Sequence, residues 1–199
     1  MEAALIGKAR LRLHQASASL ARLETLAAGI NVPAFEYEWF ITITLINSAY
    51  AIFEKAASLS PQSKQWFCSV DKHTIRKDPL LRYVLHARNM EYHNFGGATA
   101  AEVGGAKYLG YDEGSALSVA DIETGEVLQT FSGGIMLEGD VSSFSFKFRL
   151  ADVIDHGDIY EPPTSHLGAP LSDNAPVAVA RRAIEYHNAL IDEGLVKFG

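Results

Sequence analysis

The chain has 199 residues, of which 48% are hydrophobic and 21% are charged, so it can bury a core and does not have the composition of a disordered protein. Its single cysteine, Cys68, excludes an intramolecular disulfide and a cysteine-based zinc cluster. The N-terminus lacks a secretory pattern, and polar residues interrupt the most apolar run, residues 39–53. We therefore expect a soluble, cytoplasmic protein without a membrane segment.

The net charge of −7 is unevenly distributed along the chain. Residues 61–95 hold six basic and three acidic residues, whereas residues 96–199 hold six basic and sixteen acidic residues. A polyanion such as RNA is expected to favour the first segment and to avoid the second. An ordinary solvated helix surface would give the same count, so charge alone leaves both interpretations open.

Apolar residues recur at every third or fourth position over residues 2–28, which predicts a long amphipathic helix. Residues 33–58 are apolar on most sides and predict a central helix of a bundle. A polar residue followed by proline is a helix-start signal, and it opens two further predicted helices, over residues 61–76 and 78–95. A last helix is predicted over residues 175–197, with apolar positions that include Val179, Ala183, Ile184, Leu190 and Ile191.

Between the last two helices the pattern changes to glycines and short alternating runs. Residues 143–150 alternate with a period of two and predict a strand with Phe144, Phe146, Phe148 and Leu150 on one face. Residues 115–122 and 126–132 flank a Glu-Thr-Gly turn and predict a hairpin. A further strand is possible over residues 135–141, and residues 161–176, which are rich in proline, predict an extended linker.

These elements predict a mainly α fold, an up-and-down helical bundle with an inserted small antiparallel β-sheet or hairpin region. Residues 1–97 would supply the core helices, and residues 98–174 the β-rich insertion and linker. Residues 175–199 would form the closing C-terminal helix of the bundle.

The predicted helix over residues 78–95 carries a polar stripe. At about 100° per residue, Arg82, His86, Asn89 and His93 fall on one face. The core-facing residues lie opposite: Leu80, Val84, Ala87 and Phe95. Arg88 falls at the edge of the apolar side, where a guanidinium needs a carboxylate, a phosphate or access to water.

The spacing Arg88-Asn89-x-x-x-His93 resembles the R-x(4–6)-H signature of HEPN domains, the helical proteins named for higher eukaryotes and prokaryotes nucleotide-binding. The long helical pair, the third helix with its tryptophan and the Asp-Pro start of the motif helix fit the same family. The resemblance covers roughly residues 1–95 and, more loosely, the last helix, whereas the insertion is not part of the family's common core.

The resemblance implies a metal-independent endoribonuclease that leaves 2′,3′-cyclic phosphate and 5′-hydroxyl ends and uses no cofactor. By position, His93 would transfer protons, Arg88 would stabilise the phosphorane and Asn89 would orient His93 or the phosphate. Arg82 and His86 lie outside the motif and would be RNA- or phosphate-binding helpers. The family also implies a toxin or antiviral effector, with an antitoxin or another regulatory protein as a possible partner.

Arg88 and His93 are five residues apart, so their directions differ by about 140° on an ideal helix. One helix would hold this pair poorly around one phosphate, whereas two facing helices could complete a cleft. This geometry agrees with the family's habit of building its site at a homodimer interface, and we expect a homodimer in which the motif helices face each other.

Each feature has a plainer interpretation. His93 could bond nearby backbone, and Arg88 could form an internal salt bridge with Glu91 or with a carboxylate of the second helix. Cys68 is expected to be a small core residue. His86 and His93 are two helical turns apart, too far to chelate one metal ion, so no metal site is predicted. Two alternatives to a nuclease remain, a non-catalytic HEPN-like dimer that binds nucleotide or RNA and a helical module that grips a protein partner.

Overall fold

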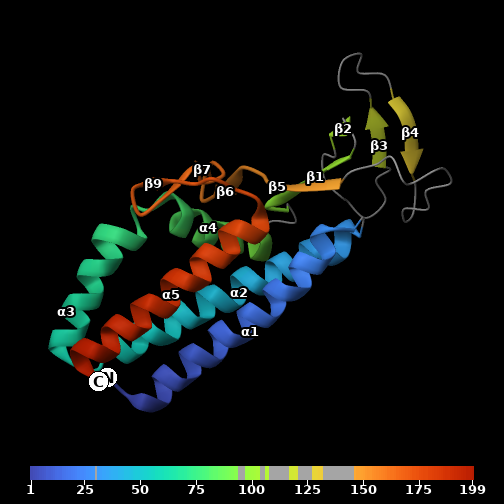
Figure 1. Ribbon diagram of the computed structural model, residues 1–199. Helices are drawn as coiled ribbons and strands as arrows, with labels where there is room; N and C mark the ends of the chain where they lie inside the picture. Colours follow the sequence, from blue (N-terminus) through green and yellow to red (C-terminus); the bar gives the residue numbers. More distant parts are fainter. Residues whose placement is uncertain (30, 94–96, 104–105, 108–116, 121–126, 132–145) are drawn as a thin grey trace.

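The computed structural model describes residues 1–29, 31–93, 97–103, 106–107, 117–120, 127–131 and 146–199. Three long helices, α1 (Ala3–Ala27), α2 (Val32–Ala57) and α5 (Pro176–Phe198), run side by side as the body of a bundle (Figure 1). The two chain ends meet at one end of this bundle, where the Met1 ammonium group donates a 2.9 Å hydrogen bond to the Phe198 carbonyl. The predicted mainly α fold is confirmed.

The bundle forms because each long helix buries one regular stripe. In α1 this stripe follows the predicted spacing of three and four residues and consists of Ile6, Ala9, Leu13, Ala16, Leu20 and Leu23. The α2 helix contributes the largest fully buried side chain, Trp39, together with Phe35 and Phe53. The five apolar positions predicted for the last helix are also buried, so the sequence pattern located its core face correctly.

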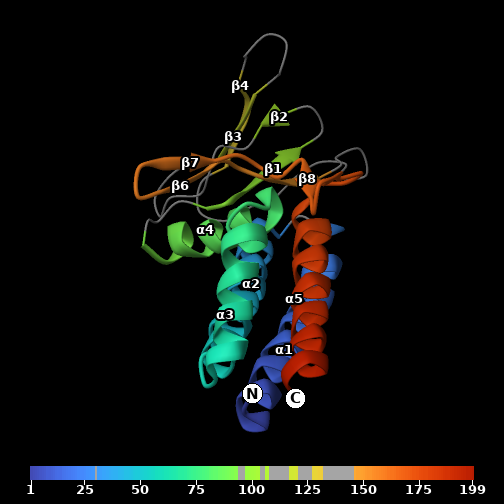
Figure 2. The same ribbon diagram turned by 90° about the vertical axis from the view of Figure 1, so that its left-hand side faces the viewer.

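Two shorter helices connect the body to the strands. The α3 helix (Pro61–Val70) is capped by Ser60, whose hydroxyl accepts a hydrogen bond from the Ser63 amide. It continues as a π-helical turn, η1 (Asp71–Ile75), whereas the sequence predicted one uniform helix. The α4 helix (Pro79–His93) then crosses the end of the bundle (Figure 2). Cys68 is exposed on α3, so its predicted place in the core was wrong.

The strands gather beyond one end of the helices (Figure 2). Strand β1 (Thr99–Val103) lies between β2 (Ala106–Lys107) and β5 (Phe146–Leu150) in an antiparallel sheet. The alternation predicted for the last of these strands is confirmed at Phe148 and Leu150, which are both buried. The Phe148 ring stacks on Phe35 of α2 with 3.6 Å between centroids, which fixes the sheet to the bundle.

The other strands form two-stranded hairpins. Strands β3 (Leu117–Ala120) and β4 (Val127–Phe131) pair antiparallel, as the sequence predicted, and project away from the helices (Figure 1). Strands β6 (Val153–Asp155) and β7 (Asp158–Tyr160) form a second hairpin.

The segment predicted as an extended linker was a further error. It contains the hairpin of β8 (Ser165–His166) and β9 (Ala169–Pro170), in which Leu167 and Gly168 both adopt a positive φ. Such a two-residue turn pairs the flanking residues directly, and the prolines stand outside its central positions. The strand proposed over residues 135–141, and Phe144 and Phe146 as members of an apolar face, lie outside the described backbone or side chains.

Tyr83 of α4 holds the two ends of the insertion together. Its hydroxyl lies 3.0 Å from the Ala98 carbonyl oxygen and 2.6 Å from the Ala151 carbonyl oxygen, and its side chain is fully buried. The Ala151 amide also donates to the Ala98 carbonyl at 2.9 Å. One phenol therefore secures both the entry to the strands and the return from them.

We expect Tyr83→Phe to lower the free energy of unfolding by about 1 to 2 kcal/mol, because the Ala98 and Ala151 carbonyl groups lose the one hydrogen that the phenol shares between them. The measurement is urea-induced unfolding followed by circular dichroism. Tyr37→Phe is the matched control, because Tyr37 is exposed and its hydroxyl should contribute less than about 0.5 kcal/mol. Equal stability of the two variants would show that the phenol does not secure the insertion.

Candidate functional site

The polar stripe of α4 exists because the helix packs its opposite side into the bundle. Asp78 caps the helix by accepting a 2.9 Å hydrogen bond from the Leu81 amide, and Pro79 follows as its first residue. Leu80, Val84 and Ala87 are buried, as the helical spacing predicted. The stripe on the other side is covered in part by the β6–β7 hairpin rather than left entirely to solvent.

Asp155 at the end of β6 joins two residues of this stripe. Its Oδ2 atom lies 2.8 Å from Nδ1 of His86 and accepts a 3.0 Å hydrogen bond from the Asn89 side-chain amide. Its other oxygen lies 3.6 Å from Nε2 of His156, which is exposed. The Asp155 carboxylate is itself buried, with 7% of its side chain exposed.

These contacts also determine the charge state of the carboxyl group. Burial by itself would raise the pKa of Asp155, but hydrogen bonds from His86 and Asn89 and the nearby imidazole of His156 outweigh it, so the pKa lies below its usual value. Asp155 is therefore an ionised acceptor at neutral pH. The Nδ1 atom of His86 must then carry the hydrogen, which leaves Nε2 as the proton-accepting nitrogen of the neutral ring.

Tyr160 on β7 fixes the plane of the same imidazole. The Tyr160 and His86 rings stack with 3.7 Å between their centroids and 12° between their planes. On the same tyrosine the guanidinium carbon of Arg82 lies 5.3 Å from the ring centroid, within cation–π range. Both of the helper residues predicted from the sequence, Arg82 and His86, therefore contact the hairpin, which limits how far either side chain can move.

Arg88 and Asn89, the first two residues of the predicted motif, are in direct contact. Nη1 of Arg88 donates a 3.1 Å hydrogen bond to Oδ1 of Asn89, and both side chains are half-buried. Asn89 thus links the guanidinium to Asp155, using its oxygen on one side and its nitrogen on the other. The guanidinium of Arg88 and the imidazole of His86 are held by one continuous chain of hydrogen bonds.

His93 is the last residue of α4, in the same helix as Asn89 and four positions beyond it. Residues four apart lie on one face of a helix, so the backbone keeps His93 on the polar stripe. The side chain of His93 lies outside the part of the structure that is described. The structure therefore brings together Arg82, His86, Arg88 and Asn89.

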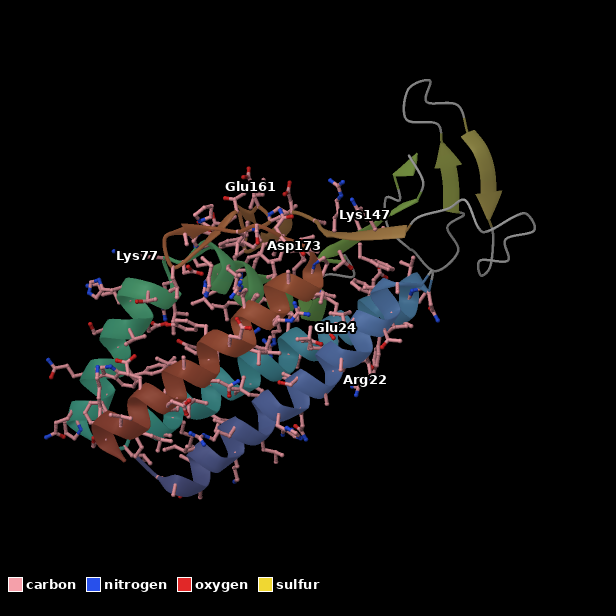
Figure 3. All side chains as sticks on the ribbon, in the orientation of Figure 1. Arg22, Glu24, Lys77, Lys147, Glu161 and Asp173 are labelled. Carbon is pink, nitrogen blue, oxygen red and sulfur yellow. The ribbon has the colours of Figure 1, made fainter. Side chains whose placement is uncertain are left out.

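Sequence reasoning missed Asp155 and Tyr160, which complete this site. The signal for them was the run Asp155-His156-Gly157-Asp158, because glycine after a polar residue favours a two-residue hairpin turn. In the structure His156 has φ 53° and Gly157 has φ 88°, as such a turn requires. Glu161, which follows β7, and Lys147 on β5 point away from the helices (Figure 3).

A second polar cluster lies at the start of α4, where Asp78 contacts the β8–β9 hairpin. Its carboxylate lies 3.0 Å from Nδ1 of His166 and accepts a 2.6 Å hydrogen bond from the Leu167 amide. Burial alone would raise the pKa of Asp78, but these hydrogen bonds and the Leu81 amide lower it overall. Two of these bonds join the hairpin to the helix and the third caps the helix, so this cluster has a structural role.

A cleft of about 420 Å³ adjoins that cluster, between the hairpin and the start of α5. Its wall includes Asp173, which is labelled in Figure 3, together with Arg181 and Arg182. The two guanidinium groups pair with Glu24 at 2.7 Å and Glu185 at 3.2 Å. Because both positive charges are already compensated, the cleft is a weaker candidate for binding an anion than the α4 site.

Among the residues that the structure describes, no group of three or more histidine, cysteine, aspartate or glutamate side chains is placed to hold a metal ion. None of the helices in the described ranges is long and apolar enough to cross a membrane.

Comparison of the chain with family models, curated proteins and solved structures gave no match. The candidate site must therefore be interpreted from its own geometry.

Proposed function

We propose that this protein is a HEPN-type, metal-independent endoribonuclease whose site is built on α4. The supporting observation is the hydrogen-bonded chain that links Arg88 through Asn89 and Asp155 to His86. It links a planar cation suited to a phosphodiester, through two side chains, to an imidazole oriented by a carboxylate. These are the groups that RNA transphosphorylation needs when no metal takes part.

The reaction begins with attack of the ribose 2′-oxygen on the adjacent phosphorus. The bond to the 5′-oxygen breaks, which leaves a 2′,3′-cyclic phosphate and a 5′-hydroxyl end. Arg88 stabilises the negative charge that develops on the phosphorane, and His93 transfers a proton. Asn89 restricts the orientation of the Arg88 guanidinium through their 3.1 Å hydrogen bond.

The proposed assembly is a cytoplasmic homodimer with the α4 helices facing each other, because positions 88 and 93 differ in direction by about 140° on an ideal helix. A toxin or antiviral role, held in check by an antitoxin, follows from the same resemblance. Size-exclusion chromatography with light scattering measures the oligomeric state. A strict monomer at micromolar concentration would contradict the dimeric site, and normal bacterial growth during expression would contradict the toxin role.

We expect the wild-type protein to cleave total tRNA in EDTA and His93→Ala to reduce the rate by about 10²- to 10⁴-fold, the usual contribution of a general acid or base. Arg88→Ala should reduce it by about 10²-fold or more, because the phosphorane loses its cation. The measurement is the initial rate of cleavage on a denaturing gel, with identification of the cyclic phosphate ends by mass spectrometry.

Matched controls come from α1, where His14 and Arg12 are exposed. His14→Ala and Arg12→Ala remove the same chemical groups from the opposite part of the bundle and should retain the full rate. Cleavage that disappears in EDTA, or that survives both α4 substitutions, would contradict the proposal.

One observation favours a second candidate, a non-catalytic RNA-binding protein. Asp155 satisfies the side-chain amide of Asn89 and Nδ1 of His86 within the same chain, as a purely structural stripe would require. That function predicts binding of tRNA without cleavage in a gel-shift assay. The slope of log affinity against log salt concentration would then measure the number of phosphate contacts.

A further inference from the structure

We infer that His86, oriented by Asp155 and Tyr160, is a second proton-transfer residue and acts as the general base that removes the 2′-hydroxyl proton. This inference rests on the proposed ribonuclease function. Transphosphorylation needs two proton transfers, one from the 2′-oxygen and one to the 5′-oxygen. Within one chain, the α4 stripe carries two imidazoles, those of His86 and His93.

The geometry of His86 is that of a base rather than of a structural histidine. Its Nδ1 lies 2.8 Å from a buried carboxylate oxygen, and its ring is stacked on Tyr160 at 3.7 Å. Its Nε2 has no hydrogen-bond partner among the residues that the structure describes. The side chain remains 22% exposed, so solvent or a ligand can reach it.

His187 on α5, by contrast, has the surroundings of a structural histidine. His187 is also held at Nδ1, 2.7 Å from the Ala183 carbonyl, but that partner is neutral and the ring is buried. A carboxylate partner stabilises the imidazolium that forms when Nε2 takes a proton, whereas a carbonyl in a buried site does so far less. Of these two histidines, His86 is equipped to accept a proton.

The hairpin that supplies the carboxylate is anchored to the bundle. Val153, two residues before Asp155, is fully buried, and the Ile154 amide donates to Sδ of Met90 at 3.3 Å. Asp155 is therefore held rigidly against α4, which suits a group that orients a base. The alternative is that the hairpin covers an anion-binding site and that Asp155 blocks it until the hairpin moves away. A hairpin with that role should make few buried contacts.

The proposed step balances without another reactant. The 2′-oxygen loses its hydrogen to Nε2 of His86 and forms a bond to phosphorus. The bond from phosphorus to the 5′-oxygen breaks, and that oxygen takes a proton from His93. The imidazolium of His86 and the neutral ring of His93 then exchange protons with water, which restores the starting state.

A substrate with an activated leaving group distinguishes the roles of the two histidines. The test compares tRNA with uridine 3′-(4-nitrophenyl phosphate), whose nitrophenolate departs without a proton. His86→Ala should lose about 10²-fold or more on both substrates, because the 2′-hydroxyl must be deprotonated in each. His93→Ala should recover most of its rate on the activated substrate alone.

Asp155→Asn tests the positioning role. The amide can present its N–H to Nδ1 and thereby reverse the tautomer, so the rate should fall about tenfold or more and the limb of the pH–rate profile assigned to the base should shift. Nitrogen-15 NMR of the wild-type protein should show Nδ1 of His86 protonated and Nε2 bare. Asp158→Asn, an exposed carboxylate in the same hairpin, is the control and should retain the wild-type rate and profile.

The outcomes distinguish the two proposals. No cleavage by the wild-type protein would overturn both of them. Cleavage that depends on His93 and Arg88 but not on His86 would overturn this inference alone. A folded Asp155→Asn or Asp155→Ala protein with a higher rate than wild type would also overturn it, because it would show that Asp155 blocks the anion site. Thermal unfolding of each variant checks that it is folded.

Discussion

Replacing Gly194 with valine is expected to destabilise the protein by about 3 kcal/mol, because the α5 helix has no room for a side chain there. A Cβ atom at Gly194 would lie 2.7 Å from Cζ of Phe53, a buried ring of α2, and 3.2 Å from Trp66 of α3. It would also approach the end of the Met1 side chain at 3.0 Å. Glycine thus allows three elements and the N-terminus to meet, although it is a poor helix former.

Urea-induced unfolding measures this effect, and two other variants define its cause. Gly7→Ala in α1 is the control, because its Cβ would contact nothing within 4 Å, and we expect it to gain about 0.5 to 1 kcal/mol from helix propensity. In a double-mutant cycle, Phe53→Leu removes the closest atom and should recover part of the loss at Gly194. A Gly194→Val protein as stable as wild type would show that the three elements can separate without cost.

The second large effect is a loss of stability in mild acid caused by His187. Burial lowers the pKa of His187 to about 4 in the folded protein, whereas the unfolded value is about 6.5. Between these values the unfolded chain binds more protons, so this contribution to stability is complete above pH 6.5 and is lost as the pH falls towards 4. From about pH 7 to 4.5 it should decrease by roughly 2 to 3 kcal/mol.

Glu36 on α2 acts in the opposite direction. Burial raises its pKa to about 6, against an ordinary value of 4.5, so the folded protein binds more protons between these values and gains stability as the pH falls. The two effects partly cancel in the wild-type protein. His187→Phe should reverse or flatten the acid-induced loss, and Glu36→Gln should make it steeper. Equal pH dependence of all three proteins, measured by urea-induced unfolding, would contradict both assignments.

The helices were predictable because each carries its own local signals. The spacing of apolar residues located the buried face of α1, and the Ser60-Pro61 and Asp78-Pro79 pairs marked the starts of α3 and α4 within a residue. The π-helical turn after α3 was not predictable, because it differs from the α-helix in bonding five rather than four residues apart, and its residues have no distinct pattern. In the structure Asp71 of that turn accepts hydrogen bonds from Tyr50 at 2.7 Å and Arg76 at 2.6 Å.

The candidate site was also predictable in its local part and not in its long-range part. The helical period of 3.6 residues predicted that Arg82, His86 and Asn89 lie on one face of α4, because all three lie within two turns of the same helix. It could not supply their partner, since Asp155 is 66 residues beyond Asn89 along the chain.

The sequence by itself therefore determined the mainly α fold, the β-rich region inserted before the last helix and the polar stripe of the motif helix. Only the tertiary structure decided that the β6–β7 hairpin returns to that stripe and presents a buried carboxylate and a tyrosine ring to His86. Periodicity and capping are local properties of a few neighbouring residues. The meeting of a hairpin and a helix depends instead on how the whole core packs, as with Phe148 on Phe35 and the Tyr83 hydroxyl on Ala98 and Ala151.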